Sequence, residues 1–129
     1  MKMRSTESKK QIVAVVGASS NPYRYSNRAV LELLQNGHEV LPIHPTETDI
    51  CGLKVKSGVN EISQNVDTFT IYVNPDHLPA IEPYITAIKP ARVIFNPGTE
   101  HPEIMERFSE NGIQVIKSCT LIMLATKQF

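Results

Sequence analysis

Ile12-Val13-Ala14-Val15-Val16-Gly17-Ala18-Ser19-Ser20-Asn21-Pro22 is the stretch that decides the fold. Its first five residues are apolar without polar alternation, which is typical of a strand covered on both faces, as in a parallel sheet. Small and turn-forming residues follow from Gly17 to Pro22. A helical pattern begins at about Ser26, and Gly37 stands where such a helix would end. Strand, small-residue loop and helix in this order predict a nucleotide-binding βαβ unit, whose helix N-terminus suits a phosphate.

The rest of the chain alternates apolar runs with helical patterns. Further strands are expected at residues 38–43, 66–73, 91–95 and 113–116, with a short edge strand at 51–55. Such alternation predicts a parallel sheet with right-handed crossovers. We therefore expect one Rossmann-like, doubly wound α/β domain of three layers over residues 12–129. Because its apolar run is unbroken, strand 12–16 is expected between the second strand and strand 66–73.

Four residues carry local expectations about where elements begin and how they pair. Pro42 cannot donate a ladder hydrogen bond, which predicts a bulge or pairing on one side only. Pro83 predicts either a kink or a helix start within the segment that leads to residue 88. Asp76 and Thr99 are expected to cap the helices that follow the third and fourth strands, the second of them over residues 100–111.

The composition excludes several classes of protein. Thirteen basic and thirteen acidic residues give a formal net charge of zero, so there is no basic field to hold nucleic acid. No apolar run approaches the length of a membrane span. Cys51 and Cys119, in a chain without a signal-peptide pattern, favour reduced thiols in the cytoplasm. Residues 1–11 are expected to form a flexible tail. The scattered histidines show no metal-ligand spacing, so no metal is expected.

The topology also predicts where a ligand would bind. In open parallel sheets the ligand lies beyond the carboxyl ends of the strands, where the strand order reverses. The loops expected at that edge are 17–26, 44–45, 73–75 and 96–98, together with the segment around Cys119.

Standard nucleotide fingerprints are missing from the first loop. A dinucleotide motif needs glycine at the positions of Gly17, Ser19 and Pro22, and only the first is present. The carboxylate that would hold the ribose of NAD is replaced by His44 and Pro45, with Glu47 only later in the loop. No Gly-Lys-Ser or Gly-Lys-Thr signature of an ATP phosphate loop occurs. These absences disfavour NAD and ATP.

The first loop instead offers hydroxyls, amides and two arginines, which can bond and neutralise a diphosphate. The pattern Gly-Ala-Ser-Ser-Asn-Pro-Tyr-Arg-Tyr-Ser-Asn over residues 17–27 resembles the CoA-binding domain family. That family includes small single-domain bacterial proteins and the N-terminal domain of the succinyl-CoA synthetase α subunit. The resemblance extends from about residue 12 to 129. Its other markers are the segments 42–45, 52–55, 95–99 and 118–120.

The resemblance implies that coenzyme A or an acyl-CoA binds at the carboxyl ends of the strands. By position, the residues that approach its diphosphate are Gly17, Ala18, Ser19 and Ser20. Charge and hydrogen bonds at the helix start would come from Arg24, Ser26 and Asn27. The adenosine part would be flanked by His44, Pro45, Val73 and Asn74, and further candidates at the same edge are Asn96, Gly98 and Cys119. The chain departs from the family at His44, Asn74 and Asn96, where many members have asparagine, arginine and glutamine.

Two functions remain open from the sequence. The first is a CoA-binding module without chemistry of its own, because no catalytic constellation is visible and the family's ligases need further domains. Sensing, storage, delivery and thiol protection of CoA all fit this module. The alternative is a small NAD(P)- or other nucleotide-dependent enzyme or regulator in which Arg24, Arg28 and His44 receive a 2′-phosphate. Cys119 is either a small buried hydrophobe or a thiol that meets the thiol end of CoA.

Overall fold

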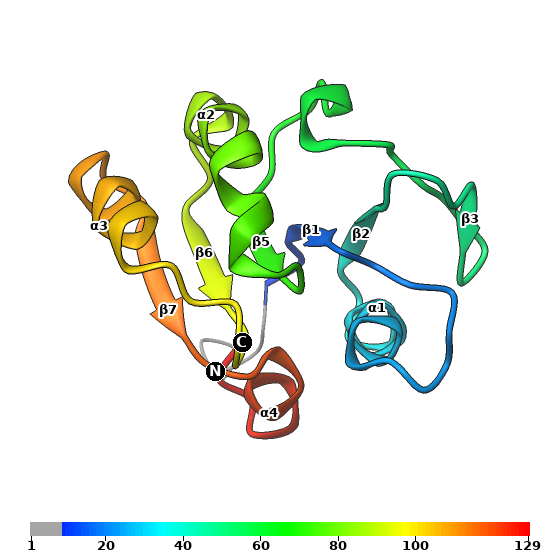
Figure 1. The fold of residues 1–129 in the computed structure, drawn as a ribbon. Coiled ribbons are helices and arrows are strands. Elements are labelled where there is room, and N and C mark those ends of the chain that lie inside the picture. The colour runs from blue at the N-terminus through cyan, green and yellow to red at the C-terminus, as the bar shows by residue number, and fades with distance from the viewer. Residues whose placement is uncertain (1–8) are drawn as a thin grey trace.

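A computed structural model describes residues 9–129. Five parallel strands form one sheet in the order β2-β1-β5-β6-β7 (Figure 1). The strands are β1 (Ile12–Val16), β2 (Glu39–Ile43), β5 (Thr68–Ile71), β6 (Arg92–Phe95) and β7 (Gln114–Lys117). The helices are α1 (Tyr25–Gln35), α2 (Leu78–Ile88), α3 (Pro102–Glu110) and α4 (Thr120–Ala125), with short 3₁₀ turns at η2 (Val59–Glu61) and η3 (Pro75–His77). The predicted Rossmann-like α/β fold is confirmed.

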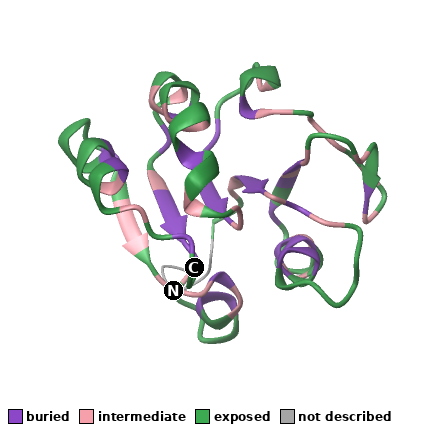
Figure 2. Ribbon diagram, in the orientation of Figure 1, coloured by how far each residue is buried: buried purple, intermediate pink, exposed green. Residues whose placement is uncertain are grey.

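The two faces of β1 organise two separate cores. Ala14 and Val16 belong to a cluster that also contains apolar side chains of α2 and α3. Val13 and Val15 belong to a second cluster, which α1 and α4 complete. Figure 2 accordingly shows the central strands buried and β7 at the edge only partly covered. Helices therefore cover both faces of the sheet, which is why the first strand needs an unbroken apolar run.

The predicted position of strand 12–16 is confirmed, because β1 pairs with β2 on one side and β5 on the other. The one-sided pairing predicted from Pro42 is also found, since β2 is an edge strand of the sheet. On its open side a single bridge joins Ile43 to Lys56, where Lys56 N–H donates to the Pro42 carbonyl. The Pro42 carbonyl accepts this hydrogen bond, and no backbone donor is needed at this position.

The short edge strand expected at 51–55 is found only at Leu53–Lys54, and its expected start and its place at the edge of the main sheet are wrong. A small antiparallel hairpin of β3 (Asp49–Ile50) and β4 (Leu53–Lys54) stands apart from the main sheet. Cys51 and Gly52 form its turn with φ of 52° and 80°. Positive φ at both central residues suits a tight hairpin turn, so the backbone reverses where the strand was expected to begin.

Both expected helix caps are also corrected. Asn74, not Asp76, is the cap after β5, because its side-chain oxygen accepts a hydrogen bond from Asp76 N–H at 2.9 Å. His101, not Thr99, caps α3, with Nδ1 accepting from Ile104 N–H at 3.3 Å. Pro102 at the first helical position favours this later start.

The helix start expected near Pro83 is wrong, because α2 begins at Leu78 and runs through Pro83. The C-terminal helix α4 was not predicted.

Most of the expected tail, residues 1–8, lies outside the described residues. Gln11, at its end, is tied to the fold, because its N–H donates to His38 Nδ1 at 3.0 Å and its carbonyl accepts from Glu39 N–H. Within residues 9–129, no helix is long and apolar enough to cross a membrane.

Candidate functional site

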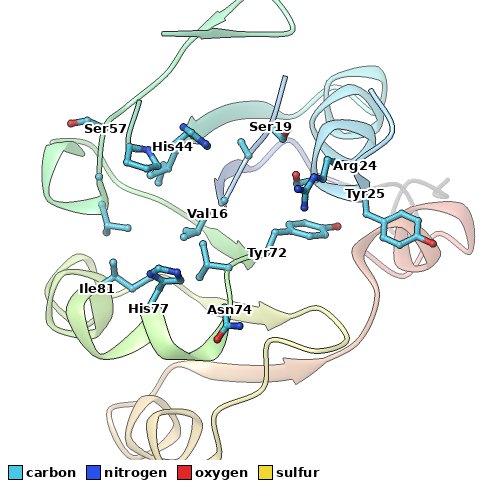
Figure 3. Close-up of a pocket in the computed structure, with 18 residues that line it drawn as sticks. Val16, Ser19, Arg24, Tyr25, His44, Ser57, Tyr72, Asn74, His77 and Ile81 are labelled. Carbon is cyan, nitrogen blue, oxygen red and sulfur yellow. The ribbon is translucent and has the colours of Figure 1, made fainter. Parts of the chain in front are cut away.

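A cavity of about 640 Å³ lies at the carboxyl ends of β1, β2 and β5, the edge expected from the sequence. Figure 3 shows Ser19 and Arg24 on one side of this first cavity and His77 and Ile81 on the other. The residues that line it are Val16, Gly17, Ala18, Ser19, Arg24, Tyr25, Ser26, Ile43, His44, Pro45, Ser57, Gly58, Val59, Tyr72, Val73, Asn74, His77 and Ile81.

Gly17 is required for the chain to leave β1 in this direction. Its φ is +87°, a region that other residues rarely adopt. A Cβ at this position would lie 2.8 Å from Val73 Cγ1 and 3.0 Å from the Tyr72 carbonyl. The N–H groups of Gly17 and Ala18 both donate to the Ile43 carbonyl, at 3.1 and 3.0 Å. The start of the loop is therefore wedged between the ends of β2 and β5.

The side chain of Asn27 holds the same loop in place. Its Nδ2 donates to the Ser19 carbonyl at 2.9 Å and lies 3.6 Å from Cys51 Sγ. Asn27 is only 5% exposed and does not line the first cavity. Its side chain thus positions the loop, and the ligand contact implied by the resemblance is not visible in this geometry.

The N-terminus of α1 is open toward the first cavity. Arg24 occupies the cap position without a side-chain cap, and no acidic residue lies in the first turn. The backbone N–H groups of Ser19, Tyr25 and Ser26 have no acceptor among residues 9–129. All of these residues line the first cavity. Free N–H groups, the positive end of the helix dipole and one guanidinium together make a site suited to an anion.

Glu47 reaches the loop from the end of β2, a contact that the sequence did not predict. Its Oε2 accepts from Ser20 N–H at 3.2 Å and lies 3.8 Å from His44 Nε2. Hydrogen bonds from Ser20 lower the pKa of the Glu47 carboxyl below its usual value. Ser20 therefore uses its N–H within the protein, and it does not line the first cavity.

His44 is fixed by its own loop. Its Nδ1 accepts from the N–H groups of Thr46 and Glu47, at 3.1 and 3.0 Å. An accepting Nδ1 leaves the proton of the neutral ring on Nε2, the nitrogen that faces Glu47. The imidazole therefore shapes this wall and holds the loop that carries the carboxylate.

A second cavity of about 540 Å³ shares Tyr25 and Tyr72 with the first. The residues that line it are Tyr25, Arg28, Tyr72, Asn96, Pro97, Cys119, Leu121 and Ile122. Burial raises the pKa of Tyr72 to about 12, so its phenol is neutral at physiological pH. Cys119 and Cys51 are both free thiols, and burial raises the pKa of Cys51.

Asn96 belongs to the frame of the second cavity. Its Nδ2 donates to Thr70 Oγ1 at 2.7 Å and to the Ile71 carbonyl at 2.9 Å, and its Oδ1 accepts from Thr120 N–H at 2.8 Å. Gly98, beside it, has φ of +91° and donates its N–H to Glu100 Oε1 at 3.0 Å. Gly98 lines neither cavity.

The candidate residues named from the sequence therefore fall into three groups. Those that line the first cavity are Gly17, Ala18, Ser19, Arg24, Ser26, His44, Pro45, Val73 and Asn74. Asn96 and Cys119 line the second cavity, whereas Ser20, Asn27 and Gly98 line neither. No group of three or more His, Cys, Asp or Glu side chains in the described part of the chain could hold a metal ion.

Nine residues that line the first cavity were not predicted from the sequence: Val16, Tyr25, Ile43, Ser57, Gly58, Val59, Tyr72, His77 and Ile81. Tyr72 follows the last residue of β5, and Tyr25 starts the helix after the first loop. Their positions at the carboxyl edge were the available signal, but aromatic residues in a strand or at a helix start more often indicate core packing.

Known proteins resemble this chain in sequence and in fold. The family model described as CoA binding domain matches residues 11–125. The uncharacterized Bacillus subtilis protein YneT is 30% identical over 69 residues, which cover 54% of this chain and 51% of that protein. The chain thus matches about half the length of this relative.

Solved structures share the fold as well. A protein from Thermus thermophilus superposes with a TM-score of 0.86 at 26% identity, over 98% of this chain and 96% of that one. A dinucleotide-forming acetyl-coenzyme A synthetase from Ca. Korarchaeum cryptofilum, in complex with phosphate and ADP, gives a TM-score of 0.72 at 25% identity. That match covers 84% of this chain and only 25% of the synthetase.

Proposed function

The chain belongs to the CoA-binding domain family, and from this premise we propose that it binds coenzyme A or an acyl-CoA in the first cavity without chemistry of its own. The diphosphate lies at the N-terminus of α1, and the adenosine part lies toward His44 and Pro45. Because both cysteines are free thiols, a reducing cytoplasm is the compartment that suits this role.

The observation that carries the proposal is the open first turn of α1. Unpaired N–H groups at Ser19, Tyr25 and Ser26 converge on a cavity that also contains the Arg24 side chain. A helix end that lacks its own cap and its own acid can be completed by an anion. A diphosphate supplies the oxygen acceptors and the charge that these groups lack.

The alternative of an NAD(P)-dependent enzyme is less well supported. Glu47, the carboxylate nearest the end of β2, bonds the loop through Ser20 N–H. Only its other oxygen remains for a ribose hydroxyl, and Glu47 lies in the loop after β2 rather than at the strand end, where an NAD site has its carboxylate. The described cavities also present no nucleophile, base and orienting group in mutual hydrogen-bond contact, which catalysis of that kind would need.

Calorimetric titration of the purified protein with CoA, NADPH and ATP tests the proposal directly. We expect CoA to bind and the other two to bind more weakly or not at all. Arg24→Ala should weaken CoA binding by about 1.5–3 kcal/mol, or roughly tenfold to a hundredfold, because it removes a charge-assisted contact. Arg107→Ala is the matched control, since it removes an arginine on α3 that lines neither cavity. Equal affinity for CoA in the Arg24 and Arg107 variants contradicts the placement of the diphosphate.

A further inference from the structure

The second cavity is apolar although it opens at the same polar edge of the sheet. Its walls are formed largely by the side chains of Tyr25, Tyr72, Pro97, Leu121 and Ile122. The Asn96 amide, which also lines this cavity, uses both its oxygen and its nitrogen in hydrogen bonds to Thr70, Ile71 and Thr120. A ligand in this cavity therefore meets mostly carbon surface. The remaining polar groups are the hydroxyls of Tyr25 and Tyr72, the Cys119 thiol and Arg28, and the Tyr72 hydroxyl has no hydrogen-bond partner among the described residues.

The second cavity shares part of its wall with the first. Tyr25 and Tyr72 line both, and Tyr25 is also the first residue of α1, where the diphosphate is proposed to lie. The part of a ligand that extends from the diphosphate on the side away from His44 would meet these two rings next. The far part of a CoA derivative is thus the part of the ligand within reach of the second cavity.

Two of its wall residues are apolar side chains left in contact with water. Tyr25 is 68% exposed and Ile122 is 61% exposed, whereas most large apolar side chains of this protein are buried. Exposed apolar surface that rims a concave site is typical of a surface that a ligand covers. Arg28, whose guanidinium lies 6.0 Å from the centre of the Tyr25 ring, is the charged group at this rim.

We propose that the second cavity holds the apolar acyl chain of an acyl-CoA whose nucleotide part occupies the first cavity. This inference rests on the proposed function and adds a preference for the acylated form. Each methylene that the walls remove from water should tighten binding about two- to fourfold, until the chain outgrows the cavity. Free CoA and short acyl-CoAs should then be the weaker ligands.

The test is a calorimetric series of CoA, butyryl-CoA, hexanoyl-CoA and octanoyl-CoA, with the oligomeric state measured by size-exclusion chromatography. Affinity that rises with chain length supports the proposal. Binding of CoA with no gain along the series overturns it and leaves the proposed function standing. No binding of any member of the series overturns both.

A matched pair of variants locates the effect. Ile122→Asp places a charge in the wall of the second cavity, and it should bring the affinity ratio of octanoyl-CoA to CoA toward one. Leu31→Asp is the control, because Leu31 is 43% exposed on α1 and lines neither cavity. It should keep the ratio of the unmodified protein. An unchanged affinity ratio in Ile122→Asp overturns the proposal. So does a dimer that this variant dissociates while the series shows no length dependence, because the apolar surface would then be a contact between two copies of the protein.

Discussion

Helices α1 and α3 both start at the carboxyl edge of the sheet, after β1 and β6, but their first turns are completed differently. At α3, His101 caps the Ile104 N–H and Glu103 lies in the first turn. At α1, Arg24 makes no side-chain cap and no acid follows. A helix start satisfied by its own chain stabilises the fold, whereas one left open can bind an anion. The difference separates a structural loop from a candidate ligand loop.

The glycines of the two loops show the same contrast. Gly17 and Gly98 both have positive φ, +87° and +91°. A Cβ on Gly17 would meet Val73 and the Tyr72 carbonyl, whereas a Cβ on Gly98 would meet nothing within 4 Å. The glycine of the first loop is thus packed closely against its neighbours, whereas the glycine of the second loop faces open space.

Gly17→Ala should therefore cause the largest loss of stability. It combines the cost of a left-handed backbone with a clash against β5, and we expect a loss of about 2–5 kcal/mol in the free energy of unfolding. Gly98→Ala, the matched control, should lose only about 1–2 kcal/mol, since it has the backbone cost without the clash. Urea unfolding of both variants measures the difference. Equal losses would contradict the wedge between β2 and β5.

Arg24→Asp tests whether α1 has been left open at the expense of stability. Asp is a favoured cap and suits the helix dipole, so the free energy of unfolding should rise by about 0.5–1 kcal/mol. The same change places a negative charge beside the proposed diphosphate, so CoA affinity should fall by about tenfold or more. Thermal unfolding and calorimetry are measured on the same preparation. A variant that gains stability and keeps its CoA affinity would contradict the anion site.

Local sequence was sufficient for the elements that local chemistry determines. The run from Ile12 to Val16 predicted a central parallel strand because burial on both faces demands such a run. The turn after it was predicted because residues 17–22 are small and turn-forming.

Choices between near neighbours could not be made from the sequence. Thr99 and His101 are both plausible caps two residues apart. The choice is decided by the Asn96 carbonyl, which accepts the Thr99 hydroxyl at 2.7 Å and so removes it from the helix.

Contacts between distant segments could not be predicted from the sequence either. Glu47 and Ser20 lie 27 residues apart, and no local pattern links them. The second cavity is likewise assembled from the start of α1, the end of β5, the loop after β6 and α4. Such a site depends on how the elements pack, which propensity and periodicity do not specify.

His101→Ala tests the other side of the comparison. It removes the cap of α3, and the free energy of unfolding should fall by about 0.5–2 kcal/mol, as for other cap deletions. CoA affinity should not change, because His101 lines neither cavity. Urea unfolding and titration with CoA check the two statements. A fall in CoA affinity without a fall in stability would show that the α3 loop takes part in binding.

The smallest effect is expected from Glu47→Gln. The two loops each contain a backbone N–H bonded to a carboxylate: Ser20 to Glu47 in the first, Gly98 to Glu100 in the second. Glutamine keeps an oxygen for the Ser20 N–H but removes a negative charge next to the proposed diphosphate. CoA affinity at neutral pH should therefore increase by a few-fold at low salt, and less at high salt, as expected of a partly exposed charge.

The lowered pKa of Glu47 also predicts how the free energy of unfolding changes with pH. A carboxyl with a depressed folded-state pKa stabilises the protein at neutral pH, and that contribution is lost as the pH falls through the folded-state value. The Glu47→Gln variant lacks this pH-dependent contribution. The free energies of unfolding of the variant and of the unmodified protein, measured as a function of pH, should therefore converge in acid. Glu100→Gln is the matched control, because its carboxylate bonds a loop that lines no part of the first cavity. It should leave CoA affinity unchanged at every salt concentration. If both glutamine variants changed CoA affinity alike, the two loops would not differ as the capping of α1 and α3 indicates.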